Sequence, residues 1–330
     1  MTSVVLLTTI DEVESLMPEW ERLQAGGASG IYTSPAWCLA AWRNFPDLGT
    51  PYVAAAVAND GTLLGVLALT VNRGRLSWPG RSLGDEHDAR VLSDSADREM
   101  TIALVHAVIR RWSSHPTVLT DVRPEGVLTG VVNSSPGCPA PILPLHEEDL
   151  EFGALGCIPG WSRKRRRGLR SARTRLVQQG TITVERLLDS RALAAALPTF
   201  VTKRLSAWND RERLHELPAM DRHPRLPQFL TDVGRDLSSQ RRCFLAQIKL
   251  DGEPIAQSLM FRTSAADLLY MSTYRPEMAR YSPSHLLLAD IACTAVAEGV
   301  RVIEMGRGDE PYKFDLGAVP RHLRDLALKA

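Results

Sequence analysis

The stretch Arg242–Phe261, RCFLAQIKLDGEPIAQSLMF, decides the fold of this chain. Two largely apolar runs flank the dipeptide Asp251-Gly252. An Asp-Gly pair between two such runs is a strong signal for the tight turn of a β-hairpin. The spacing therefore predicts two antiparallel strands, one at residues 242–250 and the other at residues 254–261.

The residues after the hairpin predict a strand, a helix and a further strand. The first strand is predicted at residues 268–274. A helix is predicted from Pro283 to Glu298, because Ser282 is a favourable N-cap, proline suits the first helical position and Gly299 favours a stop. This helix is apolar nearly all round, so we expect it to be buried. The last strand is predicted at residues 300–305.

Upstream of the hairpin, residues 162–180 concentrate the positive charge of the chain. Between Arg163 and Arg175 eight side chains are basic and none is acidic, although the formal net charge of the whole chain is only +1. A helical apolar stripe is formed by Leu169, Ala172 and Leu176. With Ser162 as N-cap and Gly180 as stop, the pattern predicts a helix that docks this stripe on a core and carries arginines on its other faces.

Two interpretations of this basic helix remain open. It is either a solvated charged surface or an anion site, in which guanidinium groups bind the oxygens of a polyphosphate or a nucleic-acid backbone. Mutual repulsion among unpaired cations on one short helix favours the anion site. The residues predicted to bind phosphate here are Arg163, Lys164, Arg166, Arg167 and Arg170.

The first half of the chain is predicted to contain a strand, two helices, three antiparallel strands, a helix, a strand and a Pro-rich passage. The ranges are 1–7, 11–23, 35–42, 51–58, 64–71, 76–78, 100–112, 118–122 and 136–144, and the second half adds 181–185, 193–208 and 228–237 before the hairpin. The second half repeats the outline of the first, which suggests a tandem duplication. At the usual domain size, we expect one domain at residues 1–150 and another at 151–330.

A loop at residues 84–90 groups three acids with a histidine. Asp85 and His87 are candidates for a general base, because a neighbouring carboxylate orients an imidazole and raises its pKa toward neutrality. The loop is equally compatible with a polar surface turn whose side chains satisfy local hydrogen bonds.

Composition excludes several classes of protein. Hydrophobic residues make up 44% and charged residues 23% of the 330 residues, which is typical of a folded soluble protein. No apolar run reaches the roughly 20 residues that a membrane span needs, and the amino terminus lacks the pattern of a signal peptide, so we expect a cytoplasmic protein. Five scattered cysteines without a C-x-x-C pair, and eight scattered histidines, predict no metal site.

Four motifs together resemble the CelD/BcsL-type acetyltransferases, a branch of the GNAT superfamily near the FemABX aminoacyl-transferring enzymes. They are the basic stretch from Arg163, LDGEPIA at 250–256, YSPSHLLL at 281–288 and GRGDEPYK at 306–313. The resemblance implies an α/β (α+β) fold of tandem GNAT-like domains, each a mixed, mostly antiparallel sheet flanked by helices. It also implies transfer of an acyl group from a thioester or ester donor to an amine.

The resemblance implies that the donor binds where the buried helix of the second half begins. Backbone N–H groups at a helix N-terminus favour phosphate. The residues expected to bind acyl-coenzyme A are Ser282, Ser284, His285 and Tyr274. The segment Arg280–His285 departs from the family pattern R/Q-x-x-G-x-G/A, because it has no glycine, and this puts coenzyme A binding in question.

The candidate catalytic residues lie on and after the last predicted strand. Glu304 is the candidate general base, Tyr312 the candidate general acid, and Lys313 a candidate to neutralise a phosphate or carboxylate. The alternative is that Asp309, Glu310 and Lys313 only pair with one another across a Gly-rich turn.

Three functions follow from these observations. The first is an N-acyltransferase that uses acyl-coenzyme A and a small-molecule amine. The second is a FemABX-like transferase that uses aminoacyl-tRNA, so that tRNA is a partner, and forms a peptide or ester bond in cell-wall or natural-product synthesis. The third, from a different class, is a non-catalytic module that binds nucleic acid or a protein partner through the basic helix. The sequence leaves the acceptor and the oligomeric state open.

Overall fold

The computed structural model describes residues 2–25, 30–92, 97–111, 117–146, 158, 161–209, 214–263 and 265–328. The chain divides into two units, unit 1 at Met1–Pro139 with His322–Ala330, and unit 2 at Ala140–Arg321. The division expected between residues 150 and 151 lies outside the described residues. The structure starts unit 2 earlier, because a strand at Ile142–Pro144 already pairs inside it.

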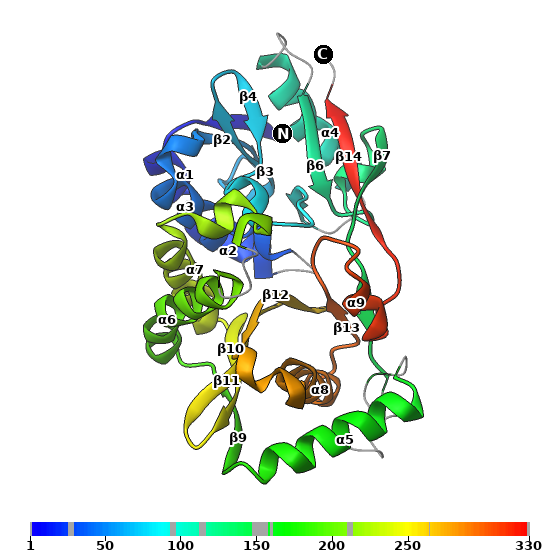
Figure 1. Cartoon of the computed structure of the whole chain (residues 1–330). Coiled ribbons are helices and arrows are strands. Elements are labelled where there is room, and N and C mark those ends of the chain that lie inside the picture. The colour runs from blue at the N-terminus through cyan, green and yellow to red at the C-terminus, as the bar shows by residue number, and fades with distance from the viewer. Residues whose placement is uncertain are drawn as a thin grey trace. The chain divides into compact units, whose positions relative to one another are not determined.

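Unit 1 contains two sheets covered by helices (Figure 1). Its elements are β1 (Ser3–Leu7), α1 (Ile10–Ser15), α2 (Met17–Ala25), α3 (Pro35–Asn44), β2 (Thr50–Val57), β3 (Leu63–Asn72), β4 (Arg75–Ser77), β5 (Arg90–Val91), α4 (Asp97–Arg111), β6 (Thr117–Val122), β7 (Ser134–Pro139) and β14 (His322–Leu328). One sheet has the order β1-β2-β3-β4, with β5 paired to β3, and the other has the order β6-β14-β7. The predicted helix at 11–23 is in fact two helices, since Pro18 lacks the N–H that a continuous helix requires.

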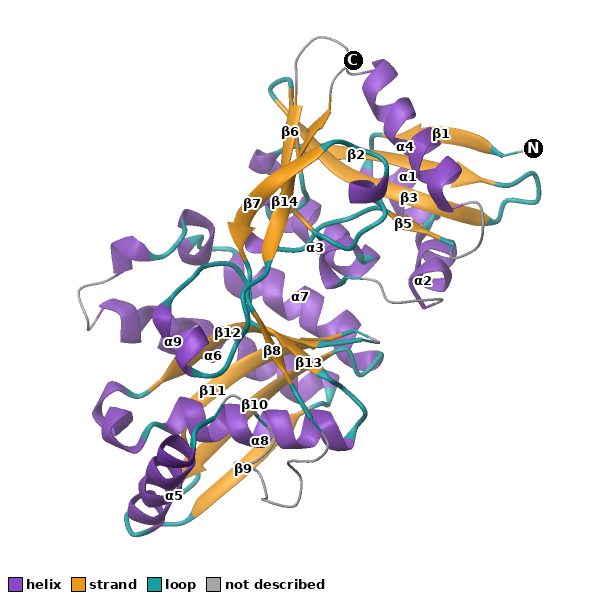
Figure 2. Ribbon diagram, turned by 90° about the vertical axis from the view of Figure 1, so that its right-hand side faces the viewer, coloured by secondary structure: helices purple, strands orange, loops and turns teal. Residues whose placement is uncertain are grey.

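Unit 2 contains one mixed sheet with helices on both of its sides (Figure 2). Its elements are β8 (Ile142–Pro144), α5 (Arg163–Val177), β9 (Ile182–Leu187), α6 (Ser190–Asn209), α7 (Leu226–Ser239), β10 (Cys243–Leu250), β11 (Glu253–Arg262), β12 (Asp267–Tyr274), α8 (Pro283–Ala297), β13 (Val302–Glu304) and α9 (Pro311–Asp315). The sheet order is β8-β13-β12-β11-β10-β9. All of its strand pairs are antiparallel except β12 with β13.

The hairpin predicted from the sequence is confirmed as β10 and β11. Its turn residues Asp251 and Gly252 have φ angles of 50° and 84°, which is the left-handed pair that a two-residue hairpin turn of this type needs. Asp tolerates the left-handed region better than most residues, and Gly adopts it without a steric penalty. The predicted mixed, mostly antiparallel sheets flanked by helices are likewise confirmed.

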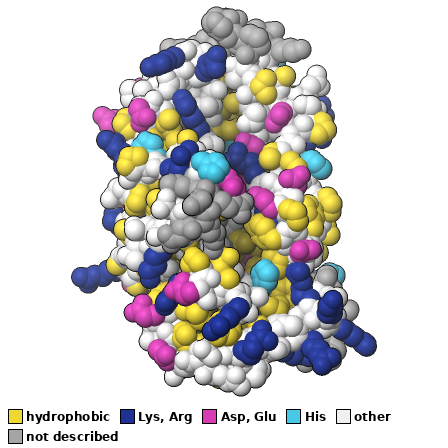
Figure 3. All heavy atoms as spheres, in the orientation of Figure 1, with side chains coloured by type: hydrophobic (Ala, Val, Ile, Leu, Met, Phe, Trp, Pro, Cys, Tyr) yellow, Lys and Arg dark blue, Asp and Glu magenta, His cyan; other side chains and the backbone are white. Residues whose placement is uncertain are grey.

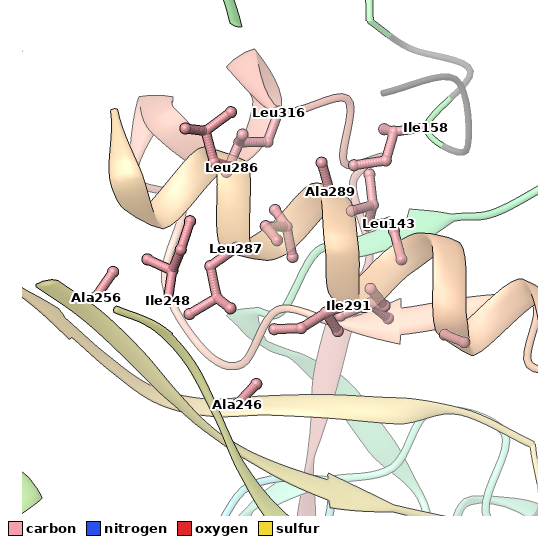
Figure 4. Close-up of a cluster of buried hydrophobic side chains, with 14 of the residues drawn as sticks. Leu143, Ile158, Ala246, Ile248, Ala256, Leu286, Leu287, Ala289, Ile291 and Leu316 are labelled. Carbon is pink, nitrogen blue, oxygen red and sulfur yellow. The ribbon is translucent and has the colours of Figure 1, made fainter. Parts of the chain in front are cut away.

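The core of unit 2 forms between α8 and one face of this sheet. Figure 4 shows Leu287 and Ile291 of α8 above Ala246 of β10, with Ile248 of the same strand beside Leu287. Helix α8 has buried residues on all of its faces, as its apolar sequence predicts, because α5 and the strands enclose it. On the other side of the sheet lie α6 and α7 (Figure 2). Strand β12 is thus packed between two helical layers.

Candidate functional site

Strands β12 and β13 separate at the centre of unit 2. They pair only through Asp267 with Ile303 and Leu268 with Glu304, after which β12 continues for six residues and β13 ends. Between β11 and β12 the register shifts at this point, so that Tyr270 is an additional residue in β12. A bulge of this kind bends a strand and redirects its side chains, and bulges are enriched next to active sites. The divergence of the two strands therefore marks a candidate active site.

The N-terminus of α8 follows β12 through a short 3-10 helix at Pro276–Tyr281. Ser282 occupies the N-cap position as predicted, but no side-chain hydrogen bond caps the helix, because Ser282 has a left-handed backbone with φ 49°. The hydroxyl of Ser284 is buried and has no hydrogen-bond partner in the described part of the chain. Unused donors at a helix N-terminus favour an anion.

Arg165 of α5 is a site residue that the sequence analysis missed. Its Nη2 lies 4.0 Å from Asp315 Oδ2 of α9, and its Nη1 is buried without a hydrogen-bond partner among the described residues. Ser162 caps α5, since its side chain accepts a hydrogen bond from the Arg165 backbone at 3.2 Å. Arg165 precedes Leu169 by four residues, so it continues the apolar stripe and points inward. That spacing was a signal in the sequence.

His285 lies close to Arg165 at the same helix end. Burial and the Arg165 guanidinium lower the pKa of His285, and Asp315 opposes them. The imidazole is therefore neutral at pH 7, as expected near a helix N-terminus, where an imidazolium is disfavoured. A neutral ring donates one hydrogen bond and accepts another, so His285 suits ligand binding better than charge neutralisation.

Glu304 and Tyr312, the candidate base and acid, both lie in unit 2. Glu304 is the last residue of β13 and is 5% exposed, and its Oε1 lies 3.9 Å from Nη1 of Arg321. Tyr312 lies in α9 with its ring half exposed. Withdrawal of its hydroxyl from water and the carboxylate of Glu310 raise the pKa of Tyr312 to about 12. The phenol is thus protonated at every physiological pH and is a weak acid.

Lys313 does not face a ligand as predicted. Its side chain is 2% exposed, and its ammonium donates hydrogen bonds to the carbonyl oxygens of Gly306, Arg307 and Gly308 and lies 3.0 Å from Glu310 Oε2. The three carbonyl oxygens match the three N–H donors of this cation, and Glu310 adds an ion pair. The correction has a physical reason: the loop between β13 and α9 turns its carbonyl groups inward, and a buried ammonium satisfies them. The contact between Glu310 and Lys313 is one part of the alternative in which Asp309, Glu310 and Lys313 pair with one another.

Asp85 and His87 lie in unit 1 and not with the candidates above. The His87 ring is fully buried and stacks on Trp78 with ring centroids 4.7 Å apart. Its neighbours fix the loop to the segment that follows β6, because Glu86 lies 3.5 Å from Arg123 and the Asp88 carboxylate accepts hydrogen bonds from the backbone of Val127 and Leu128. Asp85 is half-buried. These contacts are those of a structural turn, and the catalytic role of both residues stays a prediction.

Basic side chains gather over α5, at the lower right in Figure 3. Arg166 is half-buried, and the exposed ones are Arg163, Lys164, Arg167, Arg170, Arg173 and Arg175. Among the described residues, Arg165 alone on this helix has a carboxylate within ion-pair distance. The helix ends at Val177, before the predicted stop at Gly180. Next to its end, a pocket of about 400 Å³ is lined by Arg175, Gln178, Gln179, Arg280 and Tyr281.

Tyr274 lines a different pocket, of about 310 Å³, where β11 and β12 meet α6. Its polar walls come from Lys203 and Ser206 of α6 and from Gln257 and Thr273 of the sheet. The pocket adjoins the end of β12 that does not pair with β13, on the side of the sheet that α6 covers. This position is better suited to binding the acceptor than to binding acyl-coenzyme A, which is the ligand predicted for Tyr274.

The structure offers no obvious metal site or membrane span in the part of the chain that it describes. No cluster of three or more His, Cys, Asp or Glu side chains is arranged to hold a metal ion within those residues. None of the described helices combines the length and the apolar character needed to cross a bilayer.

Comparison with known proteins defines the class. Residues 163–314 match the model of a family described as an acetyltransferase (GNAT) domain. Most of unit 2 thus matches a GNAT acetyltransferase domain, and the chain is an acyltransferase. This result disfavours the non-catalytic binding module considered above. No curated protein matches the chain.

Solved structures with this fold span the whole chain. FemX has a TM-score of 0.62 and 13% identity, covering 99% of this chain and 97% of its own. The C-terminal domain of a putative lysylphosphatidylglycerol synthetase from Agrobacterium fabrum has a TM-score of 0.58 and 10% identity, and the match covers 96% of this chain and 93% of that one. L-PGS from Bacillus licheniformis has a TM-score of 0.54 and 14% identity, and the match covers 96% of this chain and 91% of that one. At these identities the likeness concerns the fold.

Proposed function

We propose that the protein is an N-acyltransferase, of the CelD/BcsL type, that moves an acetyl or similar acyl group from acyl-coenzyme A to a small-molecule amine. One observation carries the proposal: at the N-terminus of α8, Ser284 Oγ and the Nη1 of Arg165 from the adjacent α5 are both buried and have no hydrogen-bond partner among the described residues. A phosphate group would supply acceptors to both and would interact favourably with the helix dipole. The lack of glycine in this turn is offset by these side-chain donors.

In the proposed reaction the amine nitrogen attacks the thioester carbonyl carbon, the C–S bond breaks and coenzyme A leaves as a thiolate. The amine loses one proton, for which Glu304 is the proposed base, directly or through a water molecule. A thiol has a pKa of about 8.5, well below the value of about 12 for Tyr312, so the phenol is a poor proton donor to the thiolate. We therefore assign Tyr312 a hydrogen-bonding role toward the developing negative charge.

The test is calorimetric titration with acetyl-coenzyme A of the wild type and of Ser282→Asp. Aspartate at an N-cap stabilises a helix and tolerates the left-handed backbone, but its charge repels a bound phosphate. We expect unchanged or higher stability and a loss of affinity of about tenfold or more. Thr9→Asp, at the N-cap of α1 in unit 1, is the matched control and should bind as the wild type does. Equal affinity in all three proteins would refute the proposed donor site.

A second candidate is a FemABX-like transferase with aminoacyl-tRNA as donor. The row of exposed cations on α5 favours it, because several cations along one helix can contact several phosphates of a nucleic-acid backbone, whereas one small cofactor needs only a few of them. Filter binding of total tRNA to Arg167→Gln/Arg170→Gln at several salt concentrations separates the two. Weaker binding with a shallower salt dependence supports tRNA, whereas salt-independent or absent binding in the wild type leaves acyl-coenzyme A as the donor.

A further inference from the structure

A second polar cluster lies beyond the end of β13, around Arg204 of α6. Arg204 Nη2 lies 2.9 Å from Asp221 Oδ2, and the two side chains are only 13% and 12% exposed. The guanidinium carbon lies 5.8 Å from the centre of the Trp208 ring. Arg204 Nε is buried and has no hydrogen-bond partner in the described part of the chain. A buried donor without a partner is costly, so this atom indicates a missing acceptor.

A second guanidinium lies near the same carboxylate. Burial raises the pKa of Asp221, while Arg204 and Arg307 both lower it, so both cations are close to this side chain. Arg204 is also near enough to Tyr312 to lower the pKa of its phenol, against the larger effect of burial. Four separate segments, namely α6, the 3-10 helix Ala219–Arg222, the loop after β13 and α9, thus contribute two guanidinium groups, one carboxylate and one phenol to this cluster.

The loop that carries Arg307 is held firmly. The buried ammonium of Lys313 binds the carbonyl oxygens of Gly306, Arg307 and Gly308. The Glu310 carboxylate forms an ion pair with the same ammonium. Gly308 has φ 102°, and a Cβ there would come within 2.4 Å of Glu310 Oε2, so the turn requires glycine. A loop fixed in this way positions a cation with little loss of entropy on binding. It begins two residues after Glu304, at the end of β13 that faces the strand divergence.

We propose that Arg204, Arg307 and the Tyr312 hydroxyl bind an acidic group, a carboxylate or a phosphate, of the acceptor. The assignment to the acceptor rests on the proposed function, because the donor phosphates are accounted for at the N-terminus of α8. Guanidinium groups bind such oxygens through charge-assisted hydrogen bonds, and a phenol adds one more donor. The acceptor would then be an amine that also bears a carboxylate or phosphate, such as an amino acid or an amino sugar phosphate.

The test uses inorganic phosphate and succinate as probes, titrated calorimetrically at constant ionic strength. The proteins are the wild type, Arg307→Gln, the double variant Arg204→Gln/Asp221→Asn, which removes both charges of the buried pair together, and the control Arg222→Gln, an exposed arginine on the same 3-10 helix. We expect one or both probes to bind the wild type and the control, and about tenfold or greater loss in the other two. Thermal unfolding confirms that each variant folds.

Three outcomes would overturn the proposal. They are no saturable binding of either probe to the wild type, equal affinity in all four proteins, and a parallel loss of acetyl-coenzyme A affinity in Arg307→Gln, which would assign the acidic group to the donor. The preferred probe distinguishes a carboxylate from a phosphate. Failure of every amine to accept an acyl group would refute the proposed function instead, and the probe affinities would still report on the site.

Discussion

The two ends of helix α8 differ in how completely their polar groups are paired. At the C-terminal end, Arg262 binds the buried Asp267 through two hydrogen bonds of 2.6 and 2.8 Å and also binds Glu298. Arg186 adds contacts to Asp290 and Glu298. At the N-terminal end, Ser284 Oγ and Arg165 Nη1 are buried without partners among the described residues.

From this difference we expect a structural role for the C-terminal end and a ligand-binding role for the N-terminal end. A complete network of buried charges fixes one conformation and contributes to stability only as a whole. An incomplete one costs stability and is retained where a ligand completes it. Both ends belong to the same helix and lie against the same core. The effect of a substitution at one end can therefore be compared directly with the effect of a substitution at the other. The contrast therefore predicts opposite effects on stability and on binding.

The largest effect is expected for Arg262→Met. Asp267 is fully buried, and loss of its bidentate partner leaves an uncompensated charge inside the protein. We expect a loss of about 3–5 kcal/mol in the free energy of unfolding, measured by urea denaturation, with acetyl-coenzyme A affinity unchanged where the variant remains folded.

The double variant Arg262→Met/Asp267→Leu is the control for this substitution, because it removes both charges. It should recover most of the lost stability. A loss below about 1 kcal/mol in the single variant would show that the C-terminal network is not the stabilising end, and the comparison would fail.

Arg165→Met should give the reverse result. The methionine fills the apolar stripe beside Leu169 and removes a buried donor that has no partner among the described residues, so the free energy of unfolding should change by less than about 0.5 kcal/mol or rise. Affinity for acetyl-coenzyme A, measured by calorimetry, should fall about ten- to a hundredfold. Arg167→Met, an exposed arginine of the same helix, is the matched control and should retain affinity. Equal affinities of the two variants would remove Arg165 from the site.

Ser284→Ala should have a smaller effect of the same kind. Its hydroxyl is buried and has no hydrogen-bond partner in the part of the chain that the structure describes, so its removal should leave stability unchanged or raise it slightly. One hydrogen bond from a hydroxyl to a charged phosphate contributes about 1.5 kcal/mol at the lower end of the range for charged partners, so affinity should fall roughly tenfold. A clear loss of stability in denaturant, with affinity intact, would instead assign the hydroxyl to the helix.

The fold was largely predictable where partners are close in sequence. The hairpin β10–β11 and helix α8 follow from local turn chemistry and periodicity, and both are confirmed. Strand β14 was missed because its partners β6 and β7 lie some 200 residues earlier, and no local pattern reports a distant partner. Strand β7 was read as a Pro-rich passage. It holds two prolines, which an edge strand tolerates, and the order β6-β14-β7 places it at an edge.

The location of the candidate site was easier to predict from the sequence than the residues that form it. The last strand and the start of α8 were predicted as the location, because ligands commonly bind where strands end and helices begin. The role of Lys313 was not, since burial of a lysine depends on backbone carbonyl groups that a sequence does not show. Arg165 was predictable, because its position four residues before Leu169 places it on the inward face of α5. The total charge of a helix alone does not show the direction of each side chain.

The smallest effect concerns pH at the N-terminal end of α8. Burial and Arg165 lower the pKa of His285 from its ordinary value of 6.5, so between the folded pKa and 6.5 the unfolded chain binds more protons than the folded one. The contribution of His285 to stability is therefore present above 6.5 and is lost as pH falls through that window. Comparison of wild type and His285→Gln by thermal unfolding between about pH 7.5 and pH 5.5 should show a smaller decline in the variant.

Bound acetyl-coenzyme A should reduce this difference, because a phosphate near His285 favours the imidazolium and raises its pKa again. The C-terminal end provides the contrast, since Arg262 keeps its charge throughout this range: its hydrogen bonds to Asp267 raise its pKa further. If the decline with pH is the same in wild type and His285→Gln, with or without acetyl-coenzyme A, then no anion is held beside this imidazole, and the pairing contrast between the two ends of α8 has no functional meaning.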